Sequence, residues 1–156
     1  IMKNNITWGW TGQAHDASLA VFSKTGLEFA SHSERYSRIK NDKNLHPDLI
    51  AEALKFGKPD RIYYYERPLL KKTRQLYAKQ YTLLGKESPT TYMRKYLKDA
   101  PKSTTVSHHL GHAAYAYYTG PFDRTLVLVI DSIGEWETVS LWSGEAGKLK
   151  KLWSQK

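Results

Sequence analysis

The 156-residue sequence predicts an α/β fold in which a first unit with a mixed sheet is followed by the opening of a second, similar unit. Two observations carry this prediction. Short runs of alternating apolar and polar residues, typical of half-buried strands, are followed by longer runs with helical spacing. The pattern of the N-terminal strands then recurs near the C-terminus at an offset of roughly 120 residues, and self-similarity at a fixed offset indicates a repeated unit.

Three strands are predicted at the N-terminus. Residues 5–10 and 18–22 have strand-like patterns, and the turn at residues 11–16 contains a glycine, which lets a ligand approach the backbone closely. A hairpin turn at residues 24–26 leads into residues 27–32, where apolar and polar side chains alternate. We therefore expect three antiparallel strands to open the fold.

Helices and single strands alternate through the middle of the chain. The segment 34–42 is dense in charge and has no clear period, so we predict a loop that closes over a site. Pro47 begins a helix that Gly57 ends, since proline suits the first helical turn and glycine suits the end of a helix. The further predicted elements are strand 61–66, helices 69–84 and 90–97, strand 104–107 and helix 110–118.

The last segment repeats the opening pattern, with strands predicted at residues 125–131, 137–142 and 148–153. The complete order matches a ribonuclease-H-like half followed by the start of a second half. A duplicated fold of this kind is the actin-like ATPase (ASKHA) architecture, which binds nucleotide and metal between its halves. We predict residues 1–122 as the first half and residues 123–156 as the opening three strands of the second, in a fragment of a longer protein.

The composition excludes several classes of protein and site. There is no run of about 18 apolar residues and no charged-then-apolar leader, so we expect no membrane span and a cytoplasmic protein. No cysteine is present, which removes disulfides, thiolate ligands and thiol nucleophiles together. Histidine, aspartate and glutamate remain as the available ligands and bases.

The net charge of +9 is concentrated in one segment. Residues 55–102 carry thirteen Lys/Arg and four Asp/Glu, whereas the rest of the chain carries eleven of each. Such a block with interspersed tyrosines can bind nucleic acid through counterion release and base stacking. A solvated helical surface is the commoner explanation, so nucleic acid is the less favoured partner. The tyrosines are Tyr77, Tyr81, Tyr92 and Tyr96.

Two histidines and an aspartate predict a metal site. His108 and His112 are four residues apart at the start of a predicted helix, which places both rings on one helical face. Asp131 ends the following strand and precedes a glycine-containing turn. Without thiolates, these ligands favour iron, manganese or zinc over copper(I). His109 is three residues from His112, so spacing alone does not separate it from His108.

His15 and Asp16 lie in the turn between the first two predicted strands, where an actin-like half contacts phosphate. A histidine there can act as a general base near neutral pH, and Asp16 can orient it or cap the turn. An exposed turn histidine without a catalytic role is the ordinary alternative.

Two further groups are candidates for binding an anion. Arg38 and Lys40 could hold an oxygen of phosphate or carbamoyl phosphate, although such pairs in charged loops are most often plain surface. The backbone at Gly134 and Glu135 could contact phosphate or form a simple hairpin turn. The chain contains neither a Walker loop nor a GxGxxG fingerprint.

Five motifs, taken in order, resemble the N-terminal part of the NodU/CmcH carbamoyltransferase family. Together they extend over nearly the whole chain, which makes the resemblance much more specific than the histidine spacing alone. They are His15-Asp16-Ala17-Ser18, Glu34 to Asp42, His108 to Ala114, Pro121-Phe122-Asp123 and Asp131 to Trp136.

The resemblance implies an enzyme that transfers a carbamoyl group from carbamoyl phosphate, through a carbamoyl-adenylate made with ATP, to a hydroxyl of a small molecule. In that family the first domain is similar to the Kae1-like (TsaD) tRNA-modification proteins, and a C-terminal YrdC-like domain makes the adenylate. Because that second domain is absent from this chain, we expect the 156 residues alone to be inactive.

The resemblance also implies roles for individual residues. In the family, the first and last histidines of the HHxxH stretch and the aspartate after the next strand hold iron, which here selects His108, His112 and Asp131 as ligands of iron(II) or another divalent metal. His15 matches the catalytic histidine near the acceptor hydroxyl, and Lys40 matches the basic residue that lines the transfer pocket.

Two alternatives stand beside the carbamoyltransferase. One is a Kae1/TsaD-like subunit that transfers a threonylcarbamoyl group to tRNA, which the basic segment would suit. The other, from a different class, is a non-catalytic nucleotide-binding module of the actin-like type. The HDAS and ERYSRIK motifs favour the carbamoyltransferase over the tRNA-modifying subunit.

Overall fold

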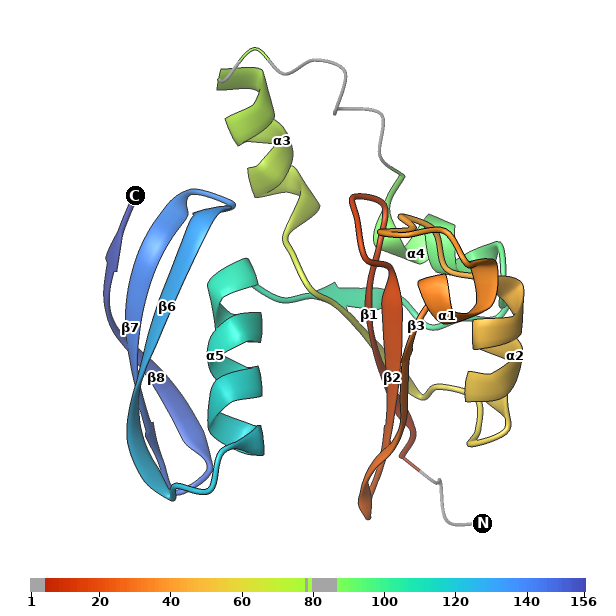
Figure 1. Cartoon of the computed structure of the whole chain (residues 1–156), viewed down its shortest axis with the longest axis horizontal. Helices are drawn as coiled ribbons and strands as arrows, with labels where there is room; N and C mark the ends of the chain where they lie inside the picture. The colour runs from red at the N-terminus through yellow and green to blue at the C-terminus, as the bar shows by residue number, and fades with distance from the viewer. Residues whose placement is uncertain (1–4, 78, 80–86) are drawn as a thin grey trace. The chain divides into compact units, whose positions relative to one another are not determined.

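A computed structural model describes residues 5–77, 79 and 87–156, and these form an α/β structure with two sheets (Figure 1). The chain divides into two compact units, Ile1–Tyr65 with Gly85–Thr105 and Glu66–Leu84 with Val106–Lys156. This division differs from the predicted boundary between residues 122 and 123. Helices α3 (Pro68–Tyr77) and α5 (His108–Thr119) precede residue 122 but belong to the second unit.

The first unit is built on a five-stranded mixed sheet with the order β3-β2-β1-β4-β5. Strands β1, β2 and β3 pair antiparallel, as predicted, whereas β4 pairs parallel with β1 and with β5. The mixed sheet predicted from the strand pattern is therefore confirmed. The strands are β1 (Thr7–Thr11), β2 (Ser18–Ser23), β3 (Gly26–His32), β4 (Arg61–Tyr64) and β5 (Ser103–Thr105).

One face of this sheet carries the main core. The register places Trp8 between Val21 and Ile62, so their side chains form an apolar row across three strands. Helices α2 (Pro47–Leu54) and α4 (Pro89–Arg94) contribute buried side chains to the same core. Helix α2 begins at Pro47, as predicted, because the His46 ring caps it by accepting a hydrogen bond from the Asp48 amide.

The second unit pairs helix α5 with a three-stranded antiparallel sheet of order β6-β7-β8. Figure 1 shows α5 lying along this sheet. Buried residues of the helix, Ala113 and Tyr117, pack against Val127, Val129 and Trp142 of the sheet. The strands are β6 (Arg124–Gly134), β7 (Glu137–Glu145) and β8 (Lys148–Gln155), each longer than the sequence predicts.

The segments 34–42 and 69–84 differ from the structure in more than the exact ends of a strand. The charged segment predicted as a loop begins with a short helix, α1 (Glu34–Ser37), and continues irregularly. Helix α3 ends at Tyr77, whereas a helix to residue 84 was expected; residues 80–86 lie outside the described part of the chain.

The tyrosines of the basic segment do not form a stacking surface as a set. The Tyr92 side chain is buried, and its hydroxyl accepts a hydrogen bond from the Leu45 amide. The Tyr96 hydroxyl donates a hydrogen bond to the Leu45 carbonyl. Tyr77 is exposed, and Tyr81 lies outside the described residues. Burial of Tyr92 removes one of the aromatic platforms on which the nucleic-acid alternative depends.

Among the helices that the structure describes, none has the length and apolar character needed to cross a membrane.

Candidate functional site

The second unit contains a cluster of two imidazoles and one carboxylate. His108 Nε2 lies 2.8 Å from Asp131 Oδ2 and 3.0 Å from His112 Nε2. One ligand atom from each of these three residues falls within 4.8 Å of the others. Nitrogen and oxygen donors of these types bind zinc, iron and manganese in proteins. The three residues therefore fit a shared divalent metal ion, with α5 supplying the imidazoles and β6 the carboxylate.

The local sequence explains why these ligands converge. The Ser107 hydroxyl accepts a hydrogen bond from the Leu110 amide and caps α5, so the helix begins at His108. Asp131 lies in β6 where its regular pairing with β7 is interrupted, between Ile130 and Gly134. The Ser132 amide donates to Asp131 Oδ1 at 2.7 Å, which leaves Oδ2 directed at His108.

The surroundings of His108 favour its neutral form. Burial lowers the pKa of His108 below its usual value, and the neighbouring His112 acts in the same direction. The carboxylates of Asp131 and Glu66 oppose this shift without reversing it. A neutral imidazole is the form that donates a nitrogen lone pair to a metal.

His109 bonds to strand β7 and is not one of the three grouped ligands. Its ring is buried, and Nδ1 lies 2.7 Å from the Ser140 hydroxyl of β7. The geometry therefore groups His108, rather than His109, with His112 and Asp131, which is the choice that spacing alone left open.

Glu135 is held by an arginine that the sequence did not single out. Its carboxylate accepts hydrogen bonds from the Arg67 amide at 2.6 Å and from Nε and Nη2 of the same residue at 3.0 and 2.8 Å. The Glu135 side chain is 5% exposed. Gly134 ends β6 and pairs with Glu137 across the turn. Phosphate binding by the backbone at Gly134 and Glu135 stays a prediction, but the Glu135 carboxylate is already engaged by Arg67.

In the first unit, two loops that the sequence singled out are joined by backbone hydrogen bonds. The Gln13 amide donates to the Lys43 carbonyl and the Ala17 amide donates to the Asp42 carbonyl, both at 2.7 Å. The turn at residues 11–16 is thus attached to the end of the segment that contains Arg38 and Lys40. That the charged segment closes over a site stays a prediction.

The side chains on these loops are accessible. His15 Nδ1 lies 2.7 Å from Asp16 Oδ2, and both residues remain open to solvent. When the carboxylate accepts the Nδ1 proton, Nε2 is the nitrogen left to accept a proton from another molecule. Arg38 and Lys40 are exposed, and Arg38 has a left-handed backbone with φ of 58°. Their proposed roles in binding an anion remain predictions.

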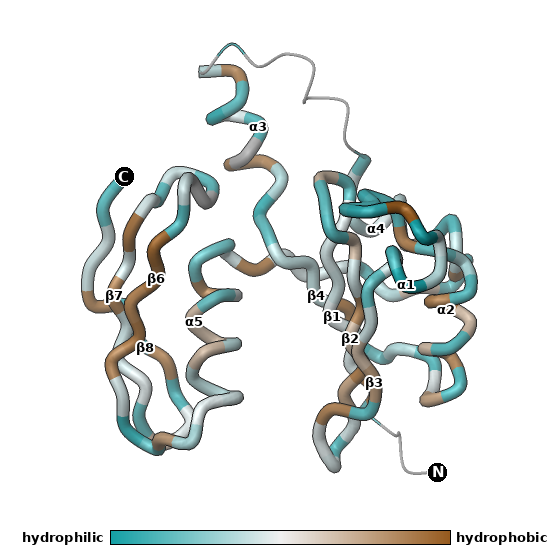
Figure 2. The backbone as a smooth tube through the Cα atoms, in the orientation of Figure 1, coloured by the Kyte–Doolittle hydropathy of each residue, from teal (hydrophilic) through white to brown (hydrophobic). Residues whose placement is uncertain are grey.

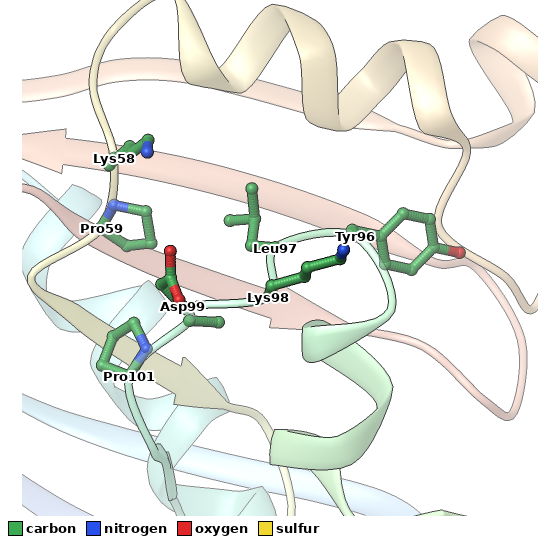
Figure 3. Close-up of a pocket in the computed structure, with 8 residues that line it drawn as sticks. Lys58, Pro59, Tyr96, Leu97, Lys98, Asp99 and Pro101 are labelled. Atoms are coloured by element: carbon green, nitrogen blue, oxygen red, sulfur yellow. The ribbon is translucent and has the colours of Figure 1, made fainter.

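The first unit also has a surface hollow of about 250 Å³ that contains none of the predicted site residues. Figure 3 shows the Tyr96 ring at one end of it, and Lys58, Pro59 and Pro101 at the other. The residues that line it are Lys58, Pro59, Tyr96, Leu97, Lys98, Asp99, Ala100 and Pro101.

Sequence reasoning missed the roles of Glu66 and Arg67, which follow strand β4 after one intervening residue. Glu66 is buried and acts on the charge of His108, while Arg67 holds Glu135. Two adjacent charged residues in the short link between a strand and Pro68 are a signal that could have drawn attention to this segment.

Comparisons with known proteins identify similar sequences. A family model described as "Carbamoyltransferase N-terminus" matches residues 69–155. An uncharacterized protein of Synechocystis sp. is 30% identical over an alignment 173 residues long, and the alignment covers 93% of this chain and 28% of that protein. An uncharacterized protein of Methanocaldococcus jannaschii is 32% identical over 120 residues, which cover 74% of this chain and 18% of that protein. The chain thus spans less than a third of the length of either relative.

The matched segment contains part of the predicted site. His108, His112, Asp131 and the Gly134-Glu135 turn fall within residues 69–155. The His15 turn and the Arg38 segment precede it.

Proposed function

Because the chain belongs to the family described as Carbamoyltransferase N-terminus, we propose that it is the N-terminal part of an O-carbamoyltransferase. The family membership supports carbamoyl transfer in general. The finer proposal is that the carbamoyl group comes from carbamoyl phosphate, is carried as a carbamoyl-adenylate made with ATP, and reaches a hydroxyl of a small molecule. One observation supports this proposal at the level of individual residues, namely the cluster of His108, His112 and Asp131.

We assign the binding of a divalent metal, iron(II) or a similar ion, to this cluster. Such an ion would supply positive charge that neutralises the phosphate oxygens of the adenylate as they leave. The chain contributes by holding His108 neutral, which keeps its nitrogen available, and by directing one Asp131 oxygen at the imidazole. Residues elsewhere in the full-length protein would complete the ligand set.

His15 is proposed as the general base. As the acceptor oxygen forms its bond to the carbamoyl carbon, the bond from that carbon to the adenylate oxygen breaks and AMP departs. The proton of the acceptor hydroxyl passes to His15, whose ring the Asp16 carboxylate orients. Lys40, and with it Arg38, would bind an anionic oxygen of the carbamoyl donor.

The fold assignment accompanies this proposal. The sheet order of the first unit, with three antiparallel strands and then two parallel ones, supports a ribonuclease-H-like half of the actin-like class. The antiparallel strands β6, β7 and β8 support a second half that begins in the same way.

The test compares His108→Ala and His112→Ala with the wild type in the full-length protein. Two quantities are measured: bound metal by elemental analysis, and ATP-dependent transfer of label from carbamoyl phosphate to a panel of alcohols. Both variants should lose metal and transfer together. The matched control is His32→Ala, which removes an exposed histidine of β3 in the other unit.

Retained metal and retained transfer in both histidine variants would contradict the metal assignment, and a wild-type protein that transfers no label to any alcohol would contradict the carbamoyltransferase itself. In that case a non-catalytic nucleotide-binding role for this part of the protein would be the better explanation.

A further inference from the structure

Helix α5 contacts the second sheet through a single buried stripe. His109, Ala113 and Tyr117 are its buried residues, spaced one turn apart. Ala113 is completely buried but small, so it lets the helix approach the sheet closely without fixing its rotation. The larger side chains at the two ends of the stripe are the ones that can fix the helix in place.

The N-terminal end of the stripe is held by a chain of buried hydrogen bonds. His109, which is 1% exposed, places Nδ1 2.7 Å from Ser140 Oγ. The Trp142 indole nitrogen donates to the same oxygen at 2.8 Å. Because an indole nitrogen only donates, Ser140 accepts there, and its hydroxyl still has a proton and a second lone pair with which to bond His109 Nδ1 in either tautomer. The hydroxyl thereby links the first turn of α5 to strand β7.

The C-terminal end of the stripe is held independently. The Tyr117 hydroxyl accepts a hydrogen bond from the Gly147 amide at 3.0 Å and donates to the Asp123 carbonyl at 3.2 Å. The two ends differ in what lies beside them. His108 and His112 flank His109 in the sequence of the helix, whereas Tyr117 is more than a turn beyond His112.

A histidine is an unfavourable choice at position 109 if burial is its only purpose. Its Nε2 has no hydrogen-bond partner among the described residues, and an unpaired polar atom in the interior lowers stability. A leucine would fill much of the same space without that penalty. The histidine side chain must therefore contribute something beyond apolar packing, and its contact with Ser140 is the specific interaction it makes.

We infer that His109 is a positioning residue for the metal cluster. Through Ser140 it fixes the rotation and height of the first turn of α5 on the sheet. Because His108 and His112 belong to this turn and the next while Asp131 belongs to β6, the same contact sets the distances between imidazoles and carboxylate. Ligand geometry must be held within a fraction of an ångström for full affinity. The inference rests on the metal binding proposed above.

The test is titration of the full-length protein with cobalt(II), followed by ligand-field absorption. This spectrum reports coordination geometry as well as affinity, and it does not depend on turnover. His109→Leu should weaken binding about 10-fold or more and change the spectrum, as loss of supporting contacts does at metal sites. His109→Asn should retain most of the affinity, because its amide reaches the position of Nδ1.

Ser140→Ala provides a second measurement that leaves the histidine in place, and it should weaken cobalt binding in the same direction. Tyr117→Phe is the matched control, since it removes the polar contacts at the other end of the same stripe. Its cobalt affinity and spectrum should stay close to those of the wild type.

Wild-type affinity and spectrum in both His109→Leu and Ser140→Ala would overturn the positioning role. Equal losses in His109→Leu and Tyr117→Phe would also overturn it, because any loosening of the helix would then suffice. A wild-type titration in His108→Ala would instead refute the proposed metal site itself, so the two failures are distinguishable.

Discussion

The ion pair between Arg67 and Glu135 gives the sharpest test of how the second unit is held together. The two residues are 68 positions apart, and three hydrogen bonds join the backbone and guanidinium of Arg67 to one carboxylate. The partners differ in exposure, since the Glu135 side chain is 5% exposed and that of Arg67 is 45% exposed. We therefore predict that removing the arginine is more costly than neutralising the glutamate.

The expected loss of stability depends on which of the two charged side chains remains after the substitution. Removing one partner of a fully buried pair costs about 3–5 kcal/mol, because the remaining charge is stranded. Among the described residues, Arg67→Leu leaves the buried Glu135 carboxylate with the backbone amide of position 67 as its donor. The half-exposed site admits water, which reduces the expected loss to about 2 kcal/mol. Glu135→Gln keeps an acceptor for that amide and leaves a guanidinium that water can solvate, so about 1 kcal/mol is expected.

Thermal unfolding of the full-length protein measures these losses, with amide exchange in the β6–β7 hairpin as a local readout. For a unit of this size, each kcal/mol lowers Tm by about 4–8 °C. The pair Arg124–Glu145 is the matched control, because it joins the other end of the same hairpin at 3.6 Å with side chains 83% and 61% exposed. Arg124→Leu should change stability by less than about 1 kcal/mol. Equal losses for both arginines, or a larger loss in Glu135→Gln than in Arg67→Leu, would refute the reasoning.

Two further predictions concern stability. The pKa of His108 is lower in the folded protein than its usual value of 6.5, so the unfolded state binds more protons between these two pH values. In the metal-free protein, the contribution of His108 to stability should therefore be complete above pH 6.5 and be lost as the pH falls through the lowered pKa. His108→Gln should flatten this dependence in denaturant titrations. Gly144→Ala should cost about 1–3 kcal/mol, because its new Cβ would lie 2.5 Å from the Tyr117 ring, whereas Gly9→Ala meets no atom within 4 Å and should be near neutral.

The strands were predictable because each has its own local signal. Alternation located β1, β2 and β3, and Pro47 marked the start of α2. Helix α1 has only four residues and no such signal. It depends on Ser33, whose amide donates to the Ala17 carbonyl and whose carbonyl accepts from the Ser37 amide. A helix set by contacts between distant segments cannot be found from the period of its own residues.

The convergence of the two imidazoles and the carboxylate was predictable for a related reason. His108 and His112 lie on one helix, and Asp131 follows on the next element, so spacing and element ends were enough to suggest their meeting. The Arg67–Glu135 pair was not, because neither residue belongs to a periodic pattern. The orientation of His109 also could not be deduced, since it depends on Ser140 lying opposite the helix in the folded sheet.

The internal repeat holds for strand register but not for burial. Trp8 pairs with Val21, and Leu128 pairs with Leu141, each 120 residues after its counterpart. The two opening hairpins therefore have the same register. Yet Trp8 is fully buried, whereas Leu128 is 58% exposed. The brown colour along β6 in Figure 2 marks this strand as hydrophobic.

The difference arises from which face of each hairpin is covered by helices. In the first unit, α2 and α4 bury the face that carries Trp8. In the second unit, α5 buries the opposite face, which carries Val127 and Val129. Strand β6 is therefore apolar on both faces, but the described residues cover one face and leave the other exposed. Backbone register follows from the hairpin's own alternation and turns, so a repeated sequence reproduces it. Burial depends on the helices that pack on each face, so it does not follow from the repeated strand pattern alone.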